Sequence, residues 1–512
     1  MDSAWIKKLC DRAAFPHPVE KVQLIETHVS WVLLTGEYVY KIKKPVDLGF
    51  VDFTSLARRH HFCLEELRLN KRTTPDLYLD VVPIADTAEG PKIGQLPAVE
   101  YALKMRQFPA GCRLDQQLTS GRLRAAHMRG LARMIAEFHE SLSAAEHVYP
   151  ARELALLRRF TLDNFDQIRA IFSHRRLPEL LSRIESWTQE QLMALAPVFE
   201  ERASRGFIRE CHGDLHLANT AVLDGRIILF DCLEFDPELR WIDLINDVGF
   251  MVMDLIAHGR DDLAFIFLNA YLEQTGDYRS IAVLRFYLVY RCMVRAKVAA
   301  LQPGAADDNK NAIWQYLWLA HKLVNQTGKP HLLIMHGFSG SGKTWLSDRL
   351  LSALPAIRVR SDLARKHLHG LKPLESSASD LEAGLYTSAA TDRTYEFLAD
   401  CCETGLRAHF DMIADATFLH QGHRAQFLQL ANRLQIAPVI VDCTVSTPVL
   451  RQRILTRATD PEHVSEADLA VLDHQLAHHD PLTANERKLT VQVSLEEAVD
   501  FPPLVQLIRN FN

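Results

Sequence analysis

The sequence lacks paired-cysteine motifs, long apolar runs and any excess of basic residues. Its nine cysteines have neither CxxC nor zinc-finger spacing, and the chain begins without a charged-then-apolar leader. Both features predict free thiols in a reducing cytoplasm. The most apolar runs, such as residues 248–256, are too short to span a bilayer, so no membrane association is predicted. The net charge of −6 gives no general attraction to nucleic acid, and no obligate protein partner is predicted.

The composition is that of a globular protein, with 48% hydrophobic and 24% charged residues. A chain of 512 residues is too long for one ordinary hydrophobic core, so two or three domains are expected. A helical pattern ends at Thr-Gly-Lys-Pro, residues 327–330, where Gly followed by Pro is a stop signal. We therefore predict a domain boundary at this point.

The central stretch, residues 211–236, reads CHGDLHLANTAVLDGRIILFDCLEFD and has the groups that phosphoryl transfer from ATP requires. Asp214, on a tight loop, would orient and deprotonate an acceptor hydroxyl, while Asn219 and Asp231 would hold the Mg²⁺ that bridges the phosphates. Glu234 and Asp236, which lie beyond Asp231, are further candidates of second rank for contact with the metal or the acceptor. The alternative interpretation is a loop between two strands with incidental acids, which does not account for three elements in register.

The spacing from Asp214 to Asn219 is that of the protein-kinase catalytic loop, with Gly213 where those enzymes carry Arg. With Gly at this position, the stretch resembles the aminoglycoside phosphotransferase and kinase-like small-molecule kinase family. The resemblance implies that an acid on the following helix braces the catalytic loop, and both Asp243 and Asp247 fit that role.

Three β-like runs between residues 21 and 44 predict a meander, with a helix after it. A kinase amino-terminal lobe places such strands over the ATP phosphates, and a lysine on the third strand pairs with a glutamate of the next helix. Lys41 is preferred because its Val-Tyr-Lys context matches the kinase strand, but Lys43 lies on the same face and stays open. Glu66 or Glu65 is the expected partner. This region has no GxGxxG loop.

A second nucleotide site is predicted after the boundary, where an apolar strand runs into GFSGSGKT, residues 337–344, and then into an amphipathic helix. This is the GxxxxGK[ST] pattern in its strand–loop–helix context. Backbone N–H groups would wrap the phosphates, Lys343 would reach the β and γ phosphates, and the Thr344 hydroxyl would bind Mg²⁺. The residues assigned to this phosphate site are Gly337, Ser339, Gly340, Ser341, Gly342, Lys343 and Thr344.

Two acids follow further strands of this second region. Asp362 comes at the end of a strand, with Arg360 before it and Arg365 after it. Asp415 ends the next strand and is placed to support the magnesium shell as a Walker-B-type acid. The pattern resembles the small P-loop kinases related to polynucleotide kinase, gluconate kinase and zeta-toxin-like enzymes. In that resemblance, Asp362 is the base for the acceptor hydroxyl and Arg365 helps to hold the acceptor.

Arginines recur along a later helix that would close over the phosphates as a lid. The resemblance implies that one lid arginine neutralises the transferred charge, and spacing alone does not say which. Arg457 is preferred, then Arg453. The alternative for each is a solvated helix face.

The predicted fold is two-domain: an α+β protein-kinase-like bilobal domain followed by an α/β P-loop NTPase domain with a parallel sheet. The boundaries are 1–326, with a small lobe of about 1–108 and a large lobe of about 109–326, and then 330–512. The predicted function is ATP- and Mg²⁺-dependent phosphotransfer at two nucleotide sites to hydroxyls of a small molecule, such as a sugar or aminocyclitol. One alternative is that only the P-loop half is catalytic, acting on a nucleic-acid 5′-hydroxyl or a nucleotide sugar, although the acidic net charge weighs against nucleic acid. Another is a nucleotide-sensing regulatory protein.

Overall fold

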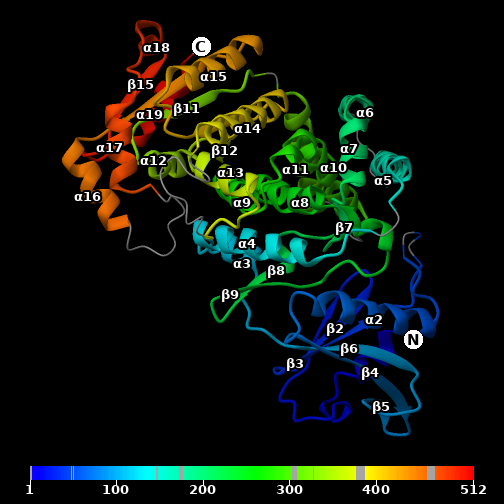
Figure 1. Ribbon diagram of the computed structural model, residues 1–512. Helices are drawn as coiled ribbons and strands as arrows, with labels where there is room; N and C mark the ends of the chain where they lie inside the picture. Colours follow the sequence, from blue (N-terminus) through cyan, green and yellow to red (C-terminus); the bar gives the residue numbers. More distant parts are fainter. Residues whose placement is uncertain are drawn as a thin grey trace. The chain divides into compact units, whose positions relative to one another are not determined.

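The structure, a computed structural model, describes residues 3–47, 49, 51–145, 148–171, 177–301, 308–326, 328–375, 387–457 and 467–511 (Figure 1). Packing divides the chain into two compact units. Unit 1 comprises residues 1–127, 137–254 and 290–318, and unit 2 comprises residues 128–136, 255–289 and 319–512. The units are discontinuous in sequence, whereas the predicted domains are continuous, and the predicted boundaries stay a prediction.

Unit 1 begins with a six-stranded antiparallel sheet, which has α2 (Leu56–Lys71) against it (Figure 1). In spatial order its strands are β1 (Gln23–Glu26), β2 (Ser30–Leu34), β3 (Tyr38–Lys43), β6 (Glu100–Arg106), β4 (Tyr78–Thr87) and β5 (Gly90–Ile93). Side chains alternate between the two faces of a strand. Tyr40 and Ile42 of β3 therefore enter the apolar core that also contains Ile6 and Leu9 of the amino-terminal segment. Lys41 and the other odd-numbered side chains of β3 lie on the opposite face.

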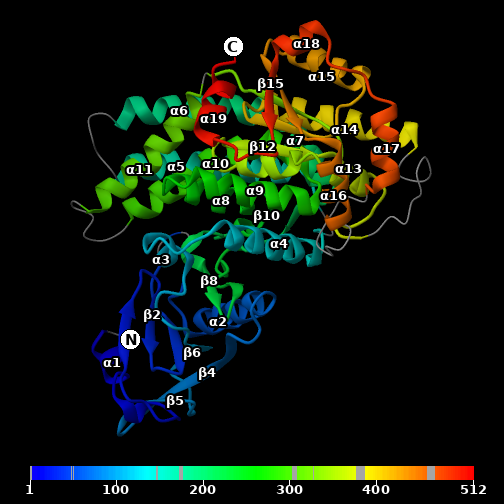
Figure 2. The same ribbon diagram turned by 90° about the vertical axis from the view of Figure 1, so that its left-hand side faces the viewer.

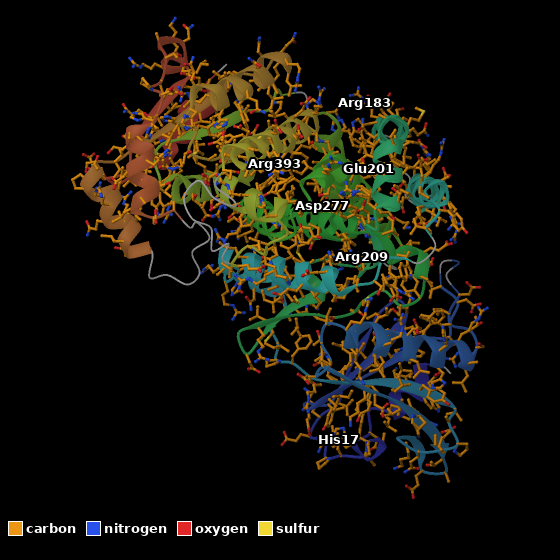
Figure 3. The ribbon with its side chains drawn as sticks, viewed as in Figure 1. His17, Arg183, Glu201, Arg209, Asp277 and Arg393 are labelled. Carbon is orange, nitrogen blue, oxygen red and sulfur yellow. The ribbon has the colours of Figure 1, made fainter. Side chains whose placement is uncertain are left out.

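The rest of unit 1 is mainly helical and holds the central stretch on short strands. Its elements include α3 (Leu114–Thr119), α5 (Pro150–Ile171), α6 (Leu177–Ala194) and α7 (Ala196–Ser204), with parts of α4 (Ala125–Ser141), α8 (Leu244–Ala257), α10 (Ile281–Ala300) and α11 (Asp308–Val324). β7 (Ile208–Glu210) pairs with β10 (Trp241–Asp243), and β8 (Thr220–Leu223) pairs with β9 (Arg226–Leu229). Arg209 of β7, labelled in Figure 3, donates hydrogen bonds to the carbonyls of His139 and Leu142. These bonds anchor the strand that leads into the central stretch.

Unit 2 contains a five-stranded parallel sheet with helices on both faces (Figure 2). In spatial order its strands are β12 (Ala356–Arg360), β13 (Asp411–Asp415), β11 (Leu332–His336), β14 (Pro438–Thr444) and β15 (Thr490–Ser494). One face of the sheet packs against α12 (Lys343–Leu350) and α19 (Phe501–Arg509). The helix α14 (Ser388–Arg407) contacts β12 and β13, and α15 (Gln421–Arg433) contacts β11. Burial on both faces explains why β11, the central strand of this sheet, is apolar from Leu332 to Met335. β15 adds a fifth strand to the four predicted from the sequence.

Unit 2 also includes α9 (Asp261–Thr275), which contacts an edge strand of the sheet. In the sequence, 80 residues separate the end of α9 from the start of this strand. That strand is β12, which has a sheet neighbour on only one side, β13. Asp277, labelled in Figure 3, begins the short 3-10 turn that follows α9. Among the helices that the structure describes, none combines the length and the apolar character needed to cross a membrane.

Candidate active sites

The loop after β7 has a backbone that only glycine adopts easily at residue 213. Gly213 has a φ of 82°, and a Cβ there would lie 3.2 Å from the carbonyl oxygen of Leu239. The Asp247 carboxylate accepts hydrogen bonds from the backbone N–H groups of His212 and Gly213, both at 3.0 Å. Asp243 is instead held by Arg202, at 2.7 Å. Of the two acids that the sequence left open, Asp247 is therefore the one in contact with the loop.

Asp214 projects from this loop and contacts two polar partners. Asn219 donates through Nδ2 to the Asp214 Oδ2 at 2.8 Å and to its backbone carbonyl at 3.0 Å. His216 Nε2 lies 3.4 Å from the same carboxylate oxygen. Burial alone would raise the pKa of Asp214, but the charge and hydrogen bond of His216 hold it below its usual value. The carboxylate is thus ionised at neutral pH, as a proton acceptor must be.

The two lysines of β3 share one buried glutamate of α2. Lys41 Nζ lies 2.8 Å from Glu66 Oε1 and 2.5 Å from Asp231 Oδ1, whereas Lys43 contacts Glu66 Oε2 at 2.8 Å and also Glu234. Burial lowers the pKa of Lys41, but Asp231 and Glu66 raise it well above its usual value overall. The structure therefore places Lys41, not Lys43, beside the aspartate predicted to bind Mg²⁺.

Glu65, the alternative partner, faces a different set of charges. It contacts Arg68 at 2.9 Å and Arg240 at 3.4 Å, and its side chain is partly exposed. Helix geometry explains the difference, because successive residues of a helix point about 100° apart. Only Glu66 faces the lysines of the sheet.

We expect Glu66→Gln to lower the free energy of unfolding by about 3 kcal/mol, because it leaves Lys41 and Lys43 buried without their shared carboxylate. Burial alone would raise the pKa of Glu66, but the two lysines lower it to about 2. The ionised Glu66 carboxylate therefore stabilises the folded state fully at pH values above its unfolded-state pKa. This stabilisation is lost as the pH falls through the folded-state pKa. Urea unfolding should show the largest difference near neutral pH and a smaller one at about pH 4.

Glu65→Gln is the matched control for this prediction. It removes a neighbouring carboxylate whose ion pair with Arg68 is partly exposed, and both Arg68 and Arg240 keep Glu210 as a partner, so a loss below about 1 kcal/mol is expected. Equal losses from the two substitutions would contradict the assignment of Glu66 as the central partner.

The residues predicted to hold Mg²⁺ in unit 1 offer suitable oxygens. Asp231 has a left-handed backbone with a φ of 61°, and the Tyr78 hydroxyl accepts a hydrogen bond from its N–H at 2.9 Å. Asn219 is held against Asp214 through its amide nitrogen, which leaves its oxygen for another partner. A carboxylate and an amide oxygen suit a hard divalent cation. The assignment of Asn219 and Asp231 as ligands remains a prediction.

The loop between β11 and α12 forms a cradle of backbone groups in unit 2. Gly337 has a φ of 137°, and a Cβ there would lie 2.7 Å from the carbonyl oxygen of Cys443. Lys343 Nζ donates to the carbonyls of Gly337 and Phe338, at 2.9 and 2.8 Å. Gln475 accepts a hydrogen bond from the Ser339 N–H at 2.9 Å, a contact that no sequence motif indicated. Such a loop at a helix amino terminus fits phosphate groups.

A cavity of about 260 Å³ opens beside this loop. It is lined by Ser339, Gly340, Gly342, Lys343, Thr344, Trp345, Arg360, Ser361, Asp362, Asp415, Ala416, Thr417 and Arg453. The predicted base and the predicted Walker-B-type acid thus face one space together with the phosphate loop. Asp415 accepts a hydrogen bond from the Ser347 hydroxyl at 2.9 Å, which fixes its orientation.

Asp362 is bound by Arg360 through two nearly parallel hydrogen bonds, at 2.8 and 3.2 Å. Burial alone would raise the pKa of Asp362, but the charge of Arg360 lowers it overall. Asp362 is the second residue of α13 (Ser361–Leu368), and Arg360 is the last residue of β12. This bidentate pairing keeps the carboxylate ionised and oriented at the cavity wall.

The arginines assigned from the sequence occupy different positions. Arg365 lies one turn beyond Asp362 on α13 and is not among the residues that line the cavity. Arg453 of α16 (Thr447–Arg457) does line it, and donates to the carbonyl of Leu495 at 2.7 Å. The side chain of Arg457 lies outside the described residues. Arg360 is the arginine that contacts Asp362, a role that spacing did not assign to it.

Two family matches cover much of the chain. Residues 100–284 match the phosphotransferase enzyme family, and residues 332–482 match an AAA domain family. The uncharacterised protein Rv2004c of Mycobacterium tuberculosis and the uncharacterised protein Mb2027c of Mycobacterium bovis are each 29% identical over 467 residues. Each alignment covers 90% of this chain and 90% of the relative. The relatives therefore share the order of both halves.

Solved structures with similar parts include a choline/ethanolamine kinase family protein from Mesorhizobium loti, with a TM-score of 0.39 and 11% identity. That match covers 64% of this chain and 95% of the other. A putative kinase from Chloroflexus aurantiacus has a TM-score of 0.29 and 24% identity over 36% of this chain and all of the other. The predicted fusion and its fold class are confirmed: the chain joins a phosphotransferase-family, kinase-like domain to a P-loop kinase-like domain with a parallel sheet.

Proposed function

We propose that this protein uses MgATP at two sites to phosphorylate hydroxyl groups of a small molecule, such as a sugar or an aminocyclitol. The observation that supports this most directly is that each unit contains both an ionised, oriented aspartate and a lysine suited to the phosphates. In unit 1 these groups are Asp214 and Lys41, and in unit 2 they are Asp362 and Lys343.

In either site the reaction would follow the same balance of bonds. The acceptor hydroxyl gives its proton to the aspartate as its oxygen forms a bond to the γ-phosphorus. The bond from the γ-phosphorus to the β–γ bridging oxygen breaks, and ADP leaves with that oxygen. Mg²⁺ offsets the charge of the phosphate oxygens, so the protein mainly has to position the groups.

The first site would use Asp214 as the base, with Asn219 holding its carboxylate and Asp247 fixing the loop beneath it. Lys41, whose ammonium is kept charged by Glu66 and Asp231, would contact the α and β phosphates. The second site would use Asp362, with Lys343 at the β and γ phosphates and Asp415 beside the metal.

The test is ATP consumption by the purified chain over a panel of sugars, aminoglycosides, nucleosides and oligonucleotides, with products identified by mass. The Asp214→Ala and Lys343→Ala variants are measured beside the parent. Two working kinases predict that the variants lose different products. Loss in Lys343→Ala alone would support the reading in which the first domain only binds substrate. Tight ATP binding without any product would favour a nucleotide sensor.

A further inference from the structure

The side chain of Asn269 holds α9 against the edge strand of the unit 2 sheet. Asn269 donates through Nδ2 to the Ala356 carbonyl at 2.9 Å and accepts from the Arg358 N–H at 2.6 Å. These two backbone groups point outward from the edge strand β12, where a further strand would otherwise pair. Asn269 is almost fully buried, so its amide completes the hydrogen bonds of this edge. α9 is therefore held in a fixed position along β12.

One helical turn later, Glu273 faces the two arginines of β12. Its Oε1 accepts from Arg358 Nε at 2.9 Å and from Arg358 Nη2 at 2.6 Å. Its Oε2 lies 3.7 Å from Arg360 Nη1. Residues four apart in a helix lie on one face, which explains why Asn269 and Glu273 both meet β12. Both arginines and Glu273 have mostly buried side chains, so these contacts are little screened by water.

Each of the two arginines is connected by hydrogen bonds to one acid of the cavity, Arg360 to Asp362 and Arg358 to Asp415. Arg360 binds Asp362 through two hydrogen bonds, and Arg358 Nη1 donates to the Ser347 hydroxyl at 3.0 Å. The Ser347 hydroxyl in turn donates to Asp415. A single carboxylate on α9 thus supports both the predicted base and the predicted metal acid. It does so from outside the cavity, because Glu273 is not among the residues that line it.

We infer that Glu273 is a positioning residue for the P-loop site, and that α9 completes this site. The inference rests on the proposed function of that site. α9 lies within residues 100–284, which match the phosphotransferase family, so a segment of the first family domain supports the catalytic groups of the second. The P-loop site accordingly requires residues that precede the predicted boundary.

The experiment uses the full-length chain with Asp214→Asn, so that turnover reports the P-loop site, and measures phosphate release from MgATP with water as the acceptor. Adding Glu273→Gln keeps the size of the side chain and removes its charge. We expect kcat to fall about tenfold while KM for MgATP changes less than about threefold, because Lys343 and the loop are untouched but the acids lose their fixed orientation. The magnesium concentration for half-maximal turnover should rise about fivefold, through Arg358 and Ser347.

Asp262→Asn is the matched control, since it removes a carboxylate from the same helix whose partner is Arg260. It should leave kcat and the magnesium requirement equal to those of the Asp214→Asn chain, which is the reference. If the melting temperature of the Glu273→Gln chain is close to that of the reference, the loss of rate comes from misplaced acids and not from unfolding. If the reference is active and Glu273→Gln does not change its kcat, the inference is wrong while the proposed function stands. A reference without Lys343-dependent turnover would overturn the proposed function of this site, and the inference with it.

Discussion

Replacement of Asp214 by Asn should reduce the kcat of the first site by about 10²- to 10⁴-fold, the range for loss of a general base. The amide keeps the size of the side chain and its contact with Asn219, but it cannot take the acceptor proton. ATP affinity should stay within about threefold, because Lys41, Glu66 and Asp231 are unchanged. Measurement of product formation with Lys343→Met in the background isolates this site.

The matched control for this prediction is Asp224→Asn. Asp224 is exposed in the turn between β8 and β9 and has a φ of 49°, a conformation that Asn also adopts readily. This variant should keep the parental rate. Parental product formation by Asp214→Asn would show that another group accepts the proton in unit 1.

The pH dependence follows from the pKa of Asp214, which His216 and other neighbours hold below its usual value despite burial. The group is ionised throughout the neutral range, so it imposes no fall in rate between about pH 6 and pH 8. Any acid limb due to Asp214 should lie below the ordinary Asp value of about 3.9.

Replacement of Lys343 by Met should reduce kcat of the P-loop site by about 10²- to 10³-fold, because it removes a preorganised positive charge from the transferring phosphate. Affinity for MgATP at this site should fall about 10- to 100-fold, as expected for loss of a hydrogen bond to a charged group. Lys343 is largely buried between the loop carbonyls, and Met fills a similar volume, so the fold should be kept. The MgATP dependence of turnover in the Asp214→Asn background measures both effects, because that substitution removes turnover, but not ATP binding, at the first site.

Lys329→Met is the control for charge alone. Lys329 lies in unit 2 before β11, is exposed, and donates a hydrogen bond to the carbonyl of Gln435 at 2.9 Å. This variant should leave both kcat and the affinity for MgATP at the P-loop site unchanged. Unchanged turnover in Lys343→Met would show that this loop does not act on the phosphates.

Local sequence patterns predicted most of the elements that carry the two sites. Alternating apolar residues predicted the strands that became β1, β2 and β3, and short strand-like runs predicted four of the five strands of the parallel sheet. Such patterns work because the side-chain period of a strand and the burial of its faces are local properties. β15 was not predicted, since its alternating residues, Thr490 to Ser494, belong to no motif.

Several choices between neighbouring residues could not be made from the sequence. Lys41 and Lys43 lie two positions apart on one strand and therefore share a face, so periodicity treats them alike. Only the approach of Asp231, 190 residues later, distinguishes them. Arg360 and Arg365 likewise both flank Asp362, and the path of β12 into α13 brings Arg360 to the carboxylate.

The sequence by itself predicted two nucleotide sites of different kinds, because each motif lies within one continuous strand–loop segment whose local geometry limits its chemistry. The glycines at 213 and 337 illustrate this, since both have positive φ values next to close backbone neighbours. The tertiary structure alone decided which charged groups meet across distant segments. Glu273 gives no sequence signal, because its side-chain partners lie 85 or more residues away and it belongs to no motif. Long-range packing, which brings α9 against β12, creates that contact.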